Sequence, residues 1–368
     1  MSSNVLTKRH LNRTLLARQL LLERVTMPAA SVVERLVGTQ AQLPGDPYVG
    51  LWSRLERFDP EELSGMIERR EAVRIPLMRA TIHLVTARDA LALRPLMAAM
   101  LERAFYAGSP FGRRVEGMDV GELVAAGRAL VDEKPLTNAE LGARLKERWP
   151  EGDALSMAYA IQYLSGLVQV TPRGLWGRSG KPALTTAEHW LGAPMVPGMA
   201  PEELVRRYLA AFGPASVADM QNWSRLTRLR EVFEGMRGEL RTFRSEGGRD
   251  LFDVPDGVIV EPDVPAPVRF LPVYDNVVLG HEDRSRIVTL EAAAGYLGAE
   301  GRNVGTVLVD GFVAGPWWIE REKRDARLVV TPAANPSAAN RADLEREATA
   351  LLAFLAADAE TRDVAISV

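Results

Sequence analysis

The chain has 368 residues, of which 47% are hydrophobic and 25% charged, and its net charge is −3 at neutral pH. This composition is typical of a globular protein with two or three domains and excludes a largely disordered chain. The sequence has no cysteine, which excludes disulfides, zinc fingers, iron–sulfur clusters and thiol nucleophiles.

The four histidines, His10, His83, His189 and His281, show no close ligand spacing, so we expect no metal site. The N-terminal segment lacks the pattern of a signal peptide. No apolar run approaches the ~20 residues that a membrane span requires. We therefore expect a cytoplasmic protein that does not interact with a membrane.

The first part of the chain reads mainly as helices. Residues 79–86, "RATIHLVT", alternate and are β-branched, which predicts a strand after several helices. This order of elements is that of a winged helix and defines a first module at residues 1–115. Apolar residues at near-helical spacing predict helices at residues 11–25, 28–43, 50–58, 60–73 and 87–105.

Two further segments repeat this scheme. A second module at residues 116–195 contains a Thr137–Glu140 capping box and a glycine-rich hairpin at residues 171–185. A third, at residues 196–262, has a helix, a turn and a second helix capped near Ser216.

The last segment, residues 263–368, changes character and is predicted to be a small α+β unit. Two β-rich runs meet at Asp310-Gly311, a strong hairpin signal. Another strand at residues 325–332 and a helix at residues 340–356 follow. We therefore predict a mainly α chain with some β structure: three tandem winged helix-turn-helix modules and a β-rich C-terminal unit.

The segment "TQAQLPG" holds two glutamines two residues apart, Gln40 and Gln42. On a helix they would point in different directions, but Pro44 disfavours helical geometry at the residue before it. An extended backbone would place both amides on one side and Ala41 on the other. Amides have no usable pKa, so they cannot act as strong bases, but they can hold a water molecule. The alternative is an exposed helix end before a loop.

Several motifs, in order along nearly the whole chain, resemble those of the AlkZ/YcaQ-type DNA glycosylases. Gln40-Ala41-Gln42 is similar to the glutamine–aliphatic–glutamine motif of the AlkZ branch, whereas the YcaQ branch has aspartate at the last position. The other matching segments are "LNRTLLARQLLL", "QAQLPGDPYVGLWSRL", "RATIHLVTARDA", "GPASVADMQNW", "FLPVYDNVVLGHEDRSRIV" and "VLVDGFVAGPWW".

The resemblance implies a monofunctional glycosylase that is C-shaped around DNA, with Gln40 and Gln42 as catalytic residues. Its expected partner is double-stranded DNA with alkylated or crosslinked guanine or adenine, especially N7-alkylguanine. It implies self-resistance to natural-product alkylators, base excision repair and no cofactor. We expect a monomer that is associated with the nucleoid when bound to DNA.

Other polar residues are candidates for DNA contact, each with a structural alternative. On a regular strand, Arg79 and His83 would share one face, either near the lesion or as a structural histidine beside an outward arginine. His281 and Arg284 lie in "GHEDRSR", where an Asp–Arg pair could instead hold the loop together. Tyr48 follows the glutamines and is a candidate for lining the site.

Basic residues gather at two further places. Arg173, Arg178 and Lys181 in the predicted hairpin would contact phosphate or serve only solubility. A second cluster in the third module comprises Arg225, Arg228 and Arg230. Trp317 and Trp318 either stack on bases or belong to the core.

Two other functions are compatible with winged-helix modules: a transcription regulator and a drug-sequestering protein. A regulator reads base edges through its recognition helix. The corresponding segment, "SMAYAIQYLSGLVQV", contains no Arg or Lys, which argues against sequence reading by the second module.

Overall fold

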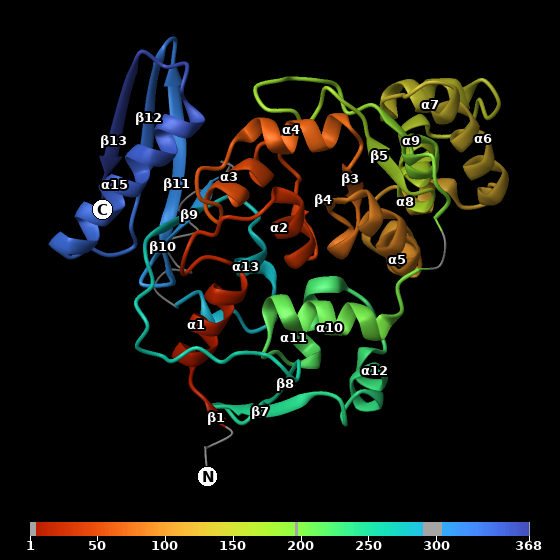
Figure 1. Ribbon diagram of the computed structural model, residues 1–368. Coiled ribbons are helices and arrows are strands. Elements are labelled where there is room, and N and C mark those ends of the chain that lie inside the picture. The colour runs from red at the N-terminus through yellow and green to blue at the C-terminus, as the bar shows by residue number, and fades with distance from the viewer. Residues whose placement is uncertain (1–4, 196–197, 290–303, 368) are drawn as a thin grey trace.

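The protein is described by a computed structural model that covers residues 5–195, 198–289 and 304–367. Helices occupy the centre, and the β-rich C-terminal unit stands to one side (Figure 1). The α+β class and the β-rich C-terminal unit are thus confirmed, while the boundaries between the three modules stay a prediction. In the described ranges, no helix is long and apolar enough to span a membrane.

The helices follow the predicted order. The segment of the first module contains α1 (Lys8–Arg18), α2 (Ala29–Arg35), α3 (Asp46–Trp52), α4 (Pro60–Glu68) and α5 (Ala87–Gly108). The second contains α6 (Val120–Glu133), α7 (Asn138–Lys146), α8 (Ala154–Leu164) and α9 (Ala187–Leu191). The third contains α10 (Pro201–Phe212), α11 (Val217–Ser224) and α12 (Leu229–Gly235). Later helices are α13 (Asn276–Leu279) and α15 (Ala338–Leu355), and short 3-10 turns are η1 (Met78–Ala80), η2 (Gly112–Val115) and η3 (Arg284–Arg286).

One five-stranded sheet joins the first two module segments. Its strand order is β2-β4-β3-β5-β6, with β2 (Thr39–Gln40), β3 (Ala72–Pro76), β4 (Ile82–Thr86), β5 (Leu167–Gln169) and β6 (Leu184–Thr186). The junction is the antiparallel pairing of Arg74 on β3 with Gln169 on β5. The predicted hairpin at residues 171–185 is the long loop between the paired strands β5 and β6. The predicted helix at 60–73 was too long, because its last two residues begin β3.

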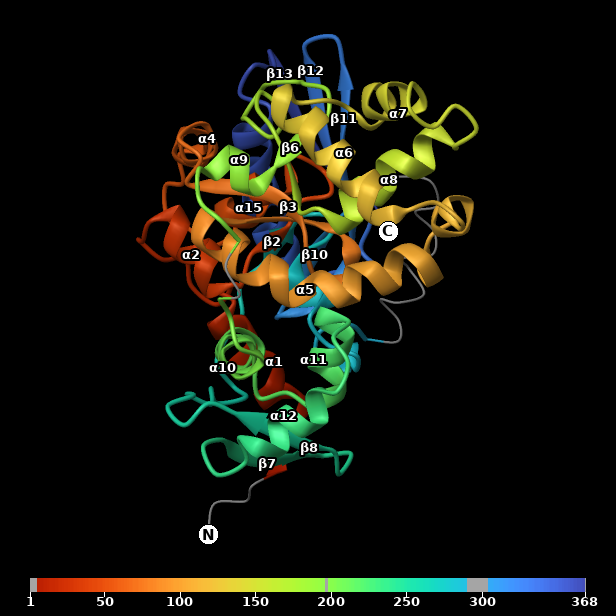
Figure 2. The ribbon, with the colours of Figure 1, turned by 90° about the vertical axis from the view of Figure 1, so that its right-hand side faces the viewer.

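A three-stranded sheet lies near the N-terminus, at the end of the molecule away from β12 and β13 (Figure 2). It consists of β1 (Val5–Leu6), β7 (Arg241–Ser245) and β8 (Asp250–Asp253). Strand β1 pairs in parallel with β7, so the first described strand belongs to the same sheet as the segment of the third module.

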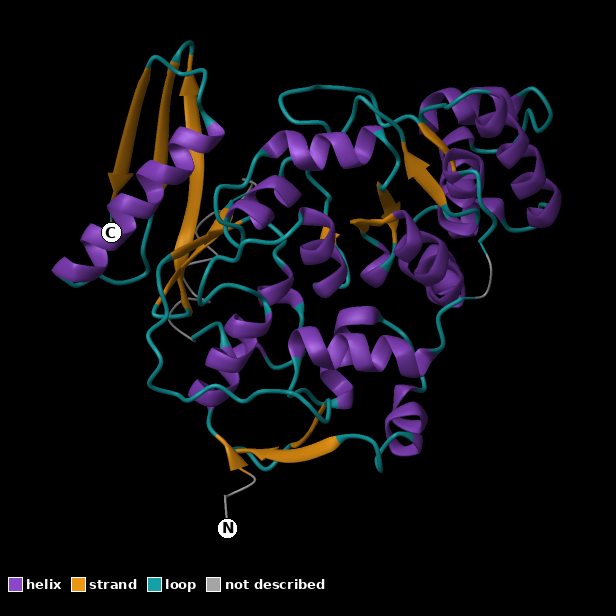
Figure 3. Ribbon diagram, viewed as in Figure 1, coloured by secondary structure: helices purple, strands orange, loops and turns teal. Residues whose placement is uncertain are grey.

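The C-terminal sheet has the order β13-β12-β11-β10-β9 and is covered on one side by α15 (Figure 3). Its strands are β9 (Arg269–Leu271), β10 (Gly305–Val309), β11 (Phe312–Glu322), β12 (Asp325–Val330) and β13 (Thr361–Ile366). The hairpin predicted at Asp310-Gly311 is confirmed, since Val309 pairs with Phe312 across it. Leu344 and Leu351 of α15 are buried against Phe270 and Leu328 of the sheet.

Helix α1 packs between these units and carries buried cations. Arg18 forms an ion pair of 2.6 Å with Asp253 on β8, and Arg13 pairs with Asp310 in the β10–β11 turn. Leu15 and Leu16 of the same helix lie in the largest apolar core. An amphipathic helix in the sequence thus becomes the element that holds distant segments together.

Candidate active site

The Gln40–Gln42 segment follows a sharp turn after α2. Val37 and Gly38 both have positive φ angles, of 56° and 84°, and a Cβ atom on Gly38 would lie 2.5 Å from Val85. Only glycine therefore permits the chain to turn this close to β4. Beyond the turn the backbone is extended, because Gln40 pairs with His83 and the Ala41 N–H donates to the carbonyl of Ile82 at 2.7 Å. The methyl group of Ala41 is buried in a core cluster.

Both glutamines are held by their carbonyl oxygens. Gln40 is only 6% exposed, and its Oε1 accepts a hydrogen bond of 2.7 Å from Nη2 of Arg79. Gln42 is exposed, and its Oε1 accepts from the backbone N–H of Ile82 at 3.3 Å. The guanidinium of Arg79 and the backbone N–H of Ile82 can only donate hydrogen bonds. Each amide must therefore turn its oxygen, and not its nitrogen, toward its donor. Neither amide nitrogen has a hydrogen-bond partner among the described residues.

Arg79 holds Gln40 from a turn and not from a strand. The predicted face shared by Arg79 and His83 on one strand is wrong, because β4 begins at Ile82 and Arg79 lies in η1 with a left-handed φ of 57°. From there Nη1 donates to the carbonyl of Trp223 at 2.9 Å. Burial and the nearby Arg225 and Arg284 lower the pKa of Arg79 to about 10, so it remains charged at neutral pH.

His83 lies opposite Gln40 on β4 and is fully buried. Its Nδ1 is 3.0 Å from the carbonyl of Thr81, which can only accept, so Nδ1 carries the proton. The other ring nitrogen, Nε2, is buried without a hydrogen-bond partner. Burial and the charge of Arg79 lower the pKa of His83 to about 3, so the ring is neutral at physiological pH.

This geometry can be compared with known proteins. The sequence matches the model of the family "DNA glycosylase AlkZ-like" over residues 33–354. The chain belongs to the AlkZ-like DNA glycosylases. It is 26% identical, over 340 residues, to an interstrand DNA cross-link repair glycosylase of Streptomyces sahachiroi, covering 86% of this chain and 87% of that protein. The structure matches that of Streptomyces sahachiroi DNA glycosylase AlkZ with a TM-score of 0.79 and 25% identity, over 99% of this chain and 100% of that one.

The resemblance noted in the sequence is therefore confirmed, and so is the assignment to an enzyme class: the protein is a DNA glycosylase, a hydrolase of N-glycosyl bonds. Both matches are named as DNA glycosylases, so they give no support to a regulator or a drug-sequestering protein.

Three of the predicted DNA contacts of this AlkZ-like protein are buried. Tyr48 is 1% exposed, and its hydroxyl donates to the carbonyl of Gly174 at 2.8 Å, which holds the β5–β6 loop. His281 is also buried, with Nε2 3.0 Å from the carbonyl of Phe212. The buried His83 makes the third. Each has an internal role, and direct DNA contact by any of them stays a prediction.

The basic residues of the β5–β6 loop and of η3 lie nearer the surface. Arg178, Lys181 and Arg284 are exposed. Arg173 is half-buried and donates to the carbonyl of Gly180 at 3.0 Å, so it closes the loop on itself. Contact of these residues with phosphate also stays a prediction.

The two tryptophans after Gly315 differ. Trp317 is 6% exposed, its Nε1 donates to the carbonyl of Leu271 at 2.9 Å, and it belongs to the core. Trp318 is less buried, and its Nε1 donates to Glu320 at 3.0 Å.

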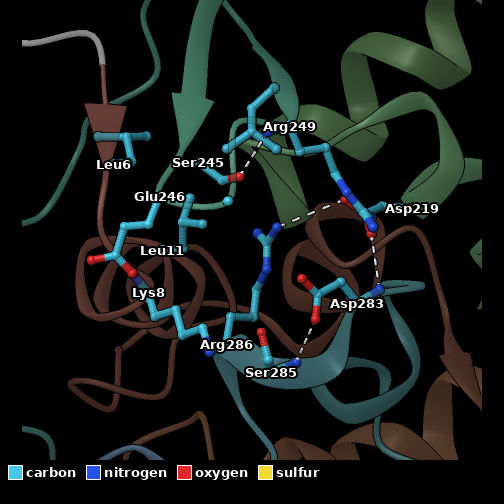
Figure 4. Close-up of a pocket in the computed structure, with 12 residues that line it drawn as sticks. Leu6, Lys8, Leu11, Asp219, Ser245, Glu246, Arg249, Asp283, Ser285 and Arg286 are labelled. Atoms are coloured by element: carbon cyan, nitrogen blue, oxygen red, sulfur yellow. Dashed lines mark hydrogen bonds and ion pairs between the residues drawn. The ribbon is translucent and has the colours of Figure 1, made fainter.

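A pocket of about 240 Å³ lies beside η3 and the β7–β8 turn (Figure 4). Arg286 lies 3.7 Å from Asp219, as Figure 4 shows. Arg249 pairs with Glu282 at 2.7 Å. Asp219 also accepts from the backbone N–H of Glu282. This region is thus a loop held to α11 by an Asp–Arg pair.

One ionisable residue near the motif was not expected. Asp46 begins α3, four residues after Gln42, and is 6% exposed, with Oδ2 lacking a hydrogen-bond partner. Burial raises the pKa of this carboxyl to about 7. An acidic residue at a helix start is common, so the sequence carries no signal for this environment.

Proposed function

We propose that this AlkZ-like protein hydrolyses the N-glycosidic bond of N7-alkylated purines in double-stranded DNA, including bases joined in interstrand crosslinks. We infer that Gln40 and Gln42 are its catalytic residues. The observation that carries the proposal is the pair of oriented amides two residues apart at the end of β2, with Gln42 exposed in the bend that follows and Gln40 fixed by Arg79.

The chemistry suits residues that do not titrate. Alkylation at N7 gives the purine a positive charge, so the base departs as a neutral molecule with the electron pair of the C1′–N9 bond. A water molecule then bonds to C1′ and loses a proton to the solvent. No protonating acid is required, which agrees with a motif of two amides beside a neutral His83.

The amides would act on the sugar side of this reaction. A carbonyl oxygen has two lone pairs, so Gln42 can still accept a hydrogen bond from the attacking water while it accepts from Ile82. The partial negative charge on the amide oxygens would also stabilise the positive charge that develops on the sugar. Holding the water in line with C1′ would lower the activation barrier further, because the water is already oriented for attack.

The test is excision of N7-methylguanine from a duplex, read as strand scission after alkali. We expect Gln42→Ala to lower the excision rate by about a hundredfold or more, as for the loss of one preorganised polar group. DNA affinity and the thermal unfolding temperature should change little, because the side chain is exposed.

Gln42→Glu is the matched variant, because a carboxylate keeps the acceptor for the Ile82 N–H and for water; it should keep excising the cationic base. A duplex with uracil, a neutral base, should stay intact with every variant. Unchanged excision by Gln42→Ala would remove this residue from the mechanism.

A further inference from the structure

A groove of about 480 Å³ lies between α5, the turn η1 and the end of α11. Helix α11 lies below α5 in the view of Figure 2, and the turn η1 contacts both helices. Three arginines from these separate elements, Arg79, Arg103 and Arg225, line the groove, and Nη2 of Arg103 lies 3.4 Å from the carbonyl of Arg225. We call this feature the arginine groove.

The arginine groove carries three positive charges without an ion-pair partner in the part of the chain that the structure describes. Within residues 5–195, 198–289 and 304–367, none of its three arginines forms an ion pair, and no acidic residue lines it. Other arginines nearby are paired: Arg228, for example, contacts Glu231 at 2.8 Å. Exposed Arg284 adds a further positive charge close enough to affect Arg79. Unpaired positive charges held together attract an anion.

The α5 residues that line the groove include Ala104, Ala107 and Gly108, which have small side chains or none. A Cβ atom added to Gly108 would meet nothing within 4 Å. Short side chains leave room for an extended polyanion to lie along the helix between the arginines. A DNA strand has this form, with one phosphate per nucleotide.

Arg79 connects the groove to the candidate catalytic residue. One planar guanidinium donates to the carbonyl of Trp223 and to Oε1 of Gln40, at 2.9 and 2.7 Å. Because the guanidinium is rigid, these two contacts fix the amide of Gln40 relative to the groove. Arg79 and Ala80 both adopt left-handed φ angles, of 57° and 56°, and this tight turn is what places the Arg79 side chain.

Building on the proposed function, we propose that the arginine groove binds phosphates of the lesion-bearing DNA strand through Arg103 and Arg225. Arg79 is then a positioning residue that aligns Gln40 with the strand held there. Phosphate binding and alignment of the amide are thus two effects of one cluster, and they are separable by experiment.

The binding part is tested with Arg103→Gln and Arg225→Asn, since both side chains are exposed and asparagine tolerates the left-handed backbone at residue 225. Affinity for a duplex is measured by fluorescence anisotropy at several salt concentrations. Each variant should bind several-fold more weakly, and the slope of log affinity against log salt should fall by about one.

The matched control is Arg346→Gln, an exposed arginine on α15, which lies far from α5 across the view of Figure 1. It should keep both the affinity and the slope of the wild type. If Arg103→Gln and Arg225→Asn have the same slope of log affinity against log salt as the wild type, the arginine groove does not bind DNA. The same conclusion follows if Arg346→Gln lowers this slope as much as they do.

The positioning part is tested with Arg79→Lys, which keeps the charge but cannot make both contacts in the same geometry. Single-turnover excision of N7-methylguanine at saturating enzyme should slow by about tenfold or more, with DNA affinity within about twofold. In a Gln40→Ala background, Arg79→Lys should have no further effect on the rate.

An equal loss in both backgrounds would overturn the positioning role, as would an unchanged rate in the single variant. Arg79→Gln replaces the lysine variant if that chain does not fold. If the wild type excises nothing, the proposed function fails, and the salt slopes still decide whether the groove binds DNA.

Discussion

His83 and His281 are neutral bases in the interior of the protein. Both are fully buried, and burial lowers the pKa of each to about 3; Arg79 contributes for His83 and Arg286 for His281. An unfolded histidine binds a proton below about pH 6.5. The unfolded chain therefore takes up protons that the folded protein does not, and stability from these residues falls as pH drops below that value.

This difference predicts a pH-dependent stability. Between about pH 6 and pH 5, we expect the free energy of unfolding of His83→Gln to depend on pH less steeply than that of the wild type, by about 1 kcal/mol per pH unit. Urea unfolding at both pH values measures the two slopes. Equal slopes would mean that His83 is protonated in the folded protein.

Asp46 acts in the opposite direction. Its pKa is raised to about 7, so between about pH 7 and pH 4 the folded protein binds a proton that the unfolded chain has released. The contribution of Asp46 to stability therefore increases as pH falls, and it offsets the stability lost through one of the two histidines. Because the two effects partly cancel in the wild type, the contribution of His83 appears as the difference in slope between the wild type and His83→Gln.

Among the elements, the β10–β11 hairpin contacts α1 through its turn. Gly311 has a φ of 78°, and a Cβ atom there would lie 2.6 Å from atoms of Asn12, Arg13 and Leu16. Its carbonyl also accepts from the amide of Asn12 at 2.7 Å. The glycine thus serves both the turn and the close approach of the helix.

We therefore expect Gly311→Ala to destabilise the protein by about 2–4 kcal/mol, from the left-handed backbone and from overpacking. The control is Gly248→Ala in the β7–β8 turn, where φ is 77° and nothing lies within 4 Å of the added Cβ. That variant should lose only about 1 kcal/mol. Chemical denaturation of both variants measures the difference, and equal losses would show that the contact with α1 contributes nothing.

How far the sequence predicts these elements depends on how local their signals are. Asp310-Gly311 marks its turn by residue type alone, so the hairpin was predictable. The turn at Arg79 was not, because Arg79 and Ala80 are left-handed residues without the usual Gly or Asn. Strand β13 was missed because it is specified by pairing with β12, across the intervening helix α15.

The candidate site likewise has one part that the sequence predicts and one part that only the fold creates. The two glutamines were found from a short motif and the bend that Pro44 imposes. Arg103 was not singled out, since an arginine on a helix is usually solvated, and only the fold brings it to Arg225. Chemistry that rests on one segment is visible in the sequence, whereas chemistry assembled from several is not.

Over the whole molecule, buried ion pairs connect segments far apart in the chain. Arg18 and Asp253 form two hydrogen bonds, of 2.6 and 2.8 Å, with side-chain exposures of 8% and 0%. Arg54 and Asp275 are joined in the same way. Each buried charge depends on its partner, since water cannot replace it.

We expect Asp253→Ala to lower the free energy of unfolding by about 3–5 kcal/mol, because Arg18 would be left buried and unpaired. The control is Asp358→Ala, whose partner Arg321 lies at the surface, and it should produce no measurable change. Thermal or urea unfolding followed by circular dichroism tests both. A small effect of Asp253→Ala would show that water reaches Arg18.

The continuous sheet from β2 to β6 has a consequence for how damaged bases are reached. The strands of the two segments are joined at one backbone pairing, Arg74 with Gln169, so swinging these parts apart about a hinge would break that pairing. We expect the enzyme to act as a preformed template, with the double helix doing the bending or opening. Lesions that weaken stacking would then be preferred simply because the duplex around them deforms more easily.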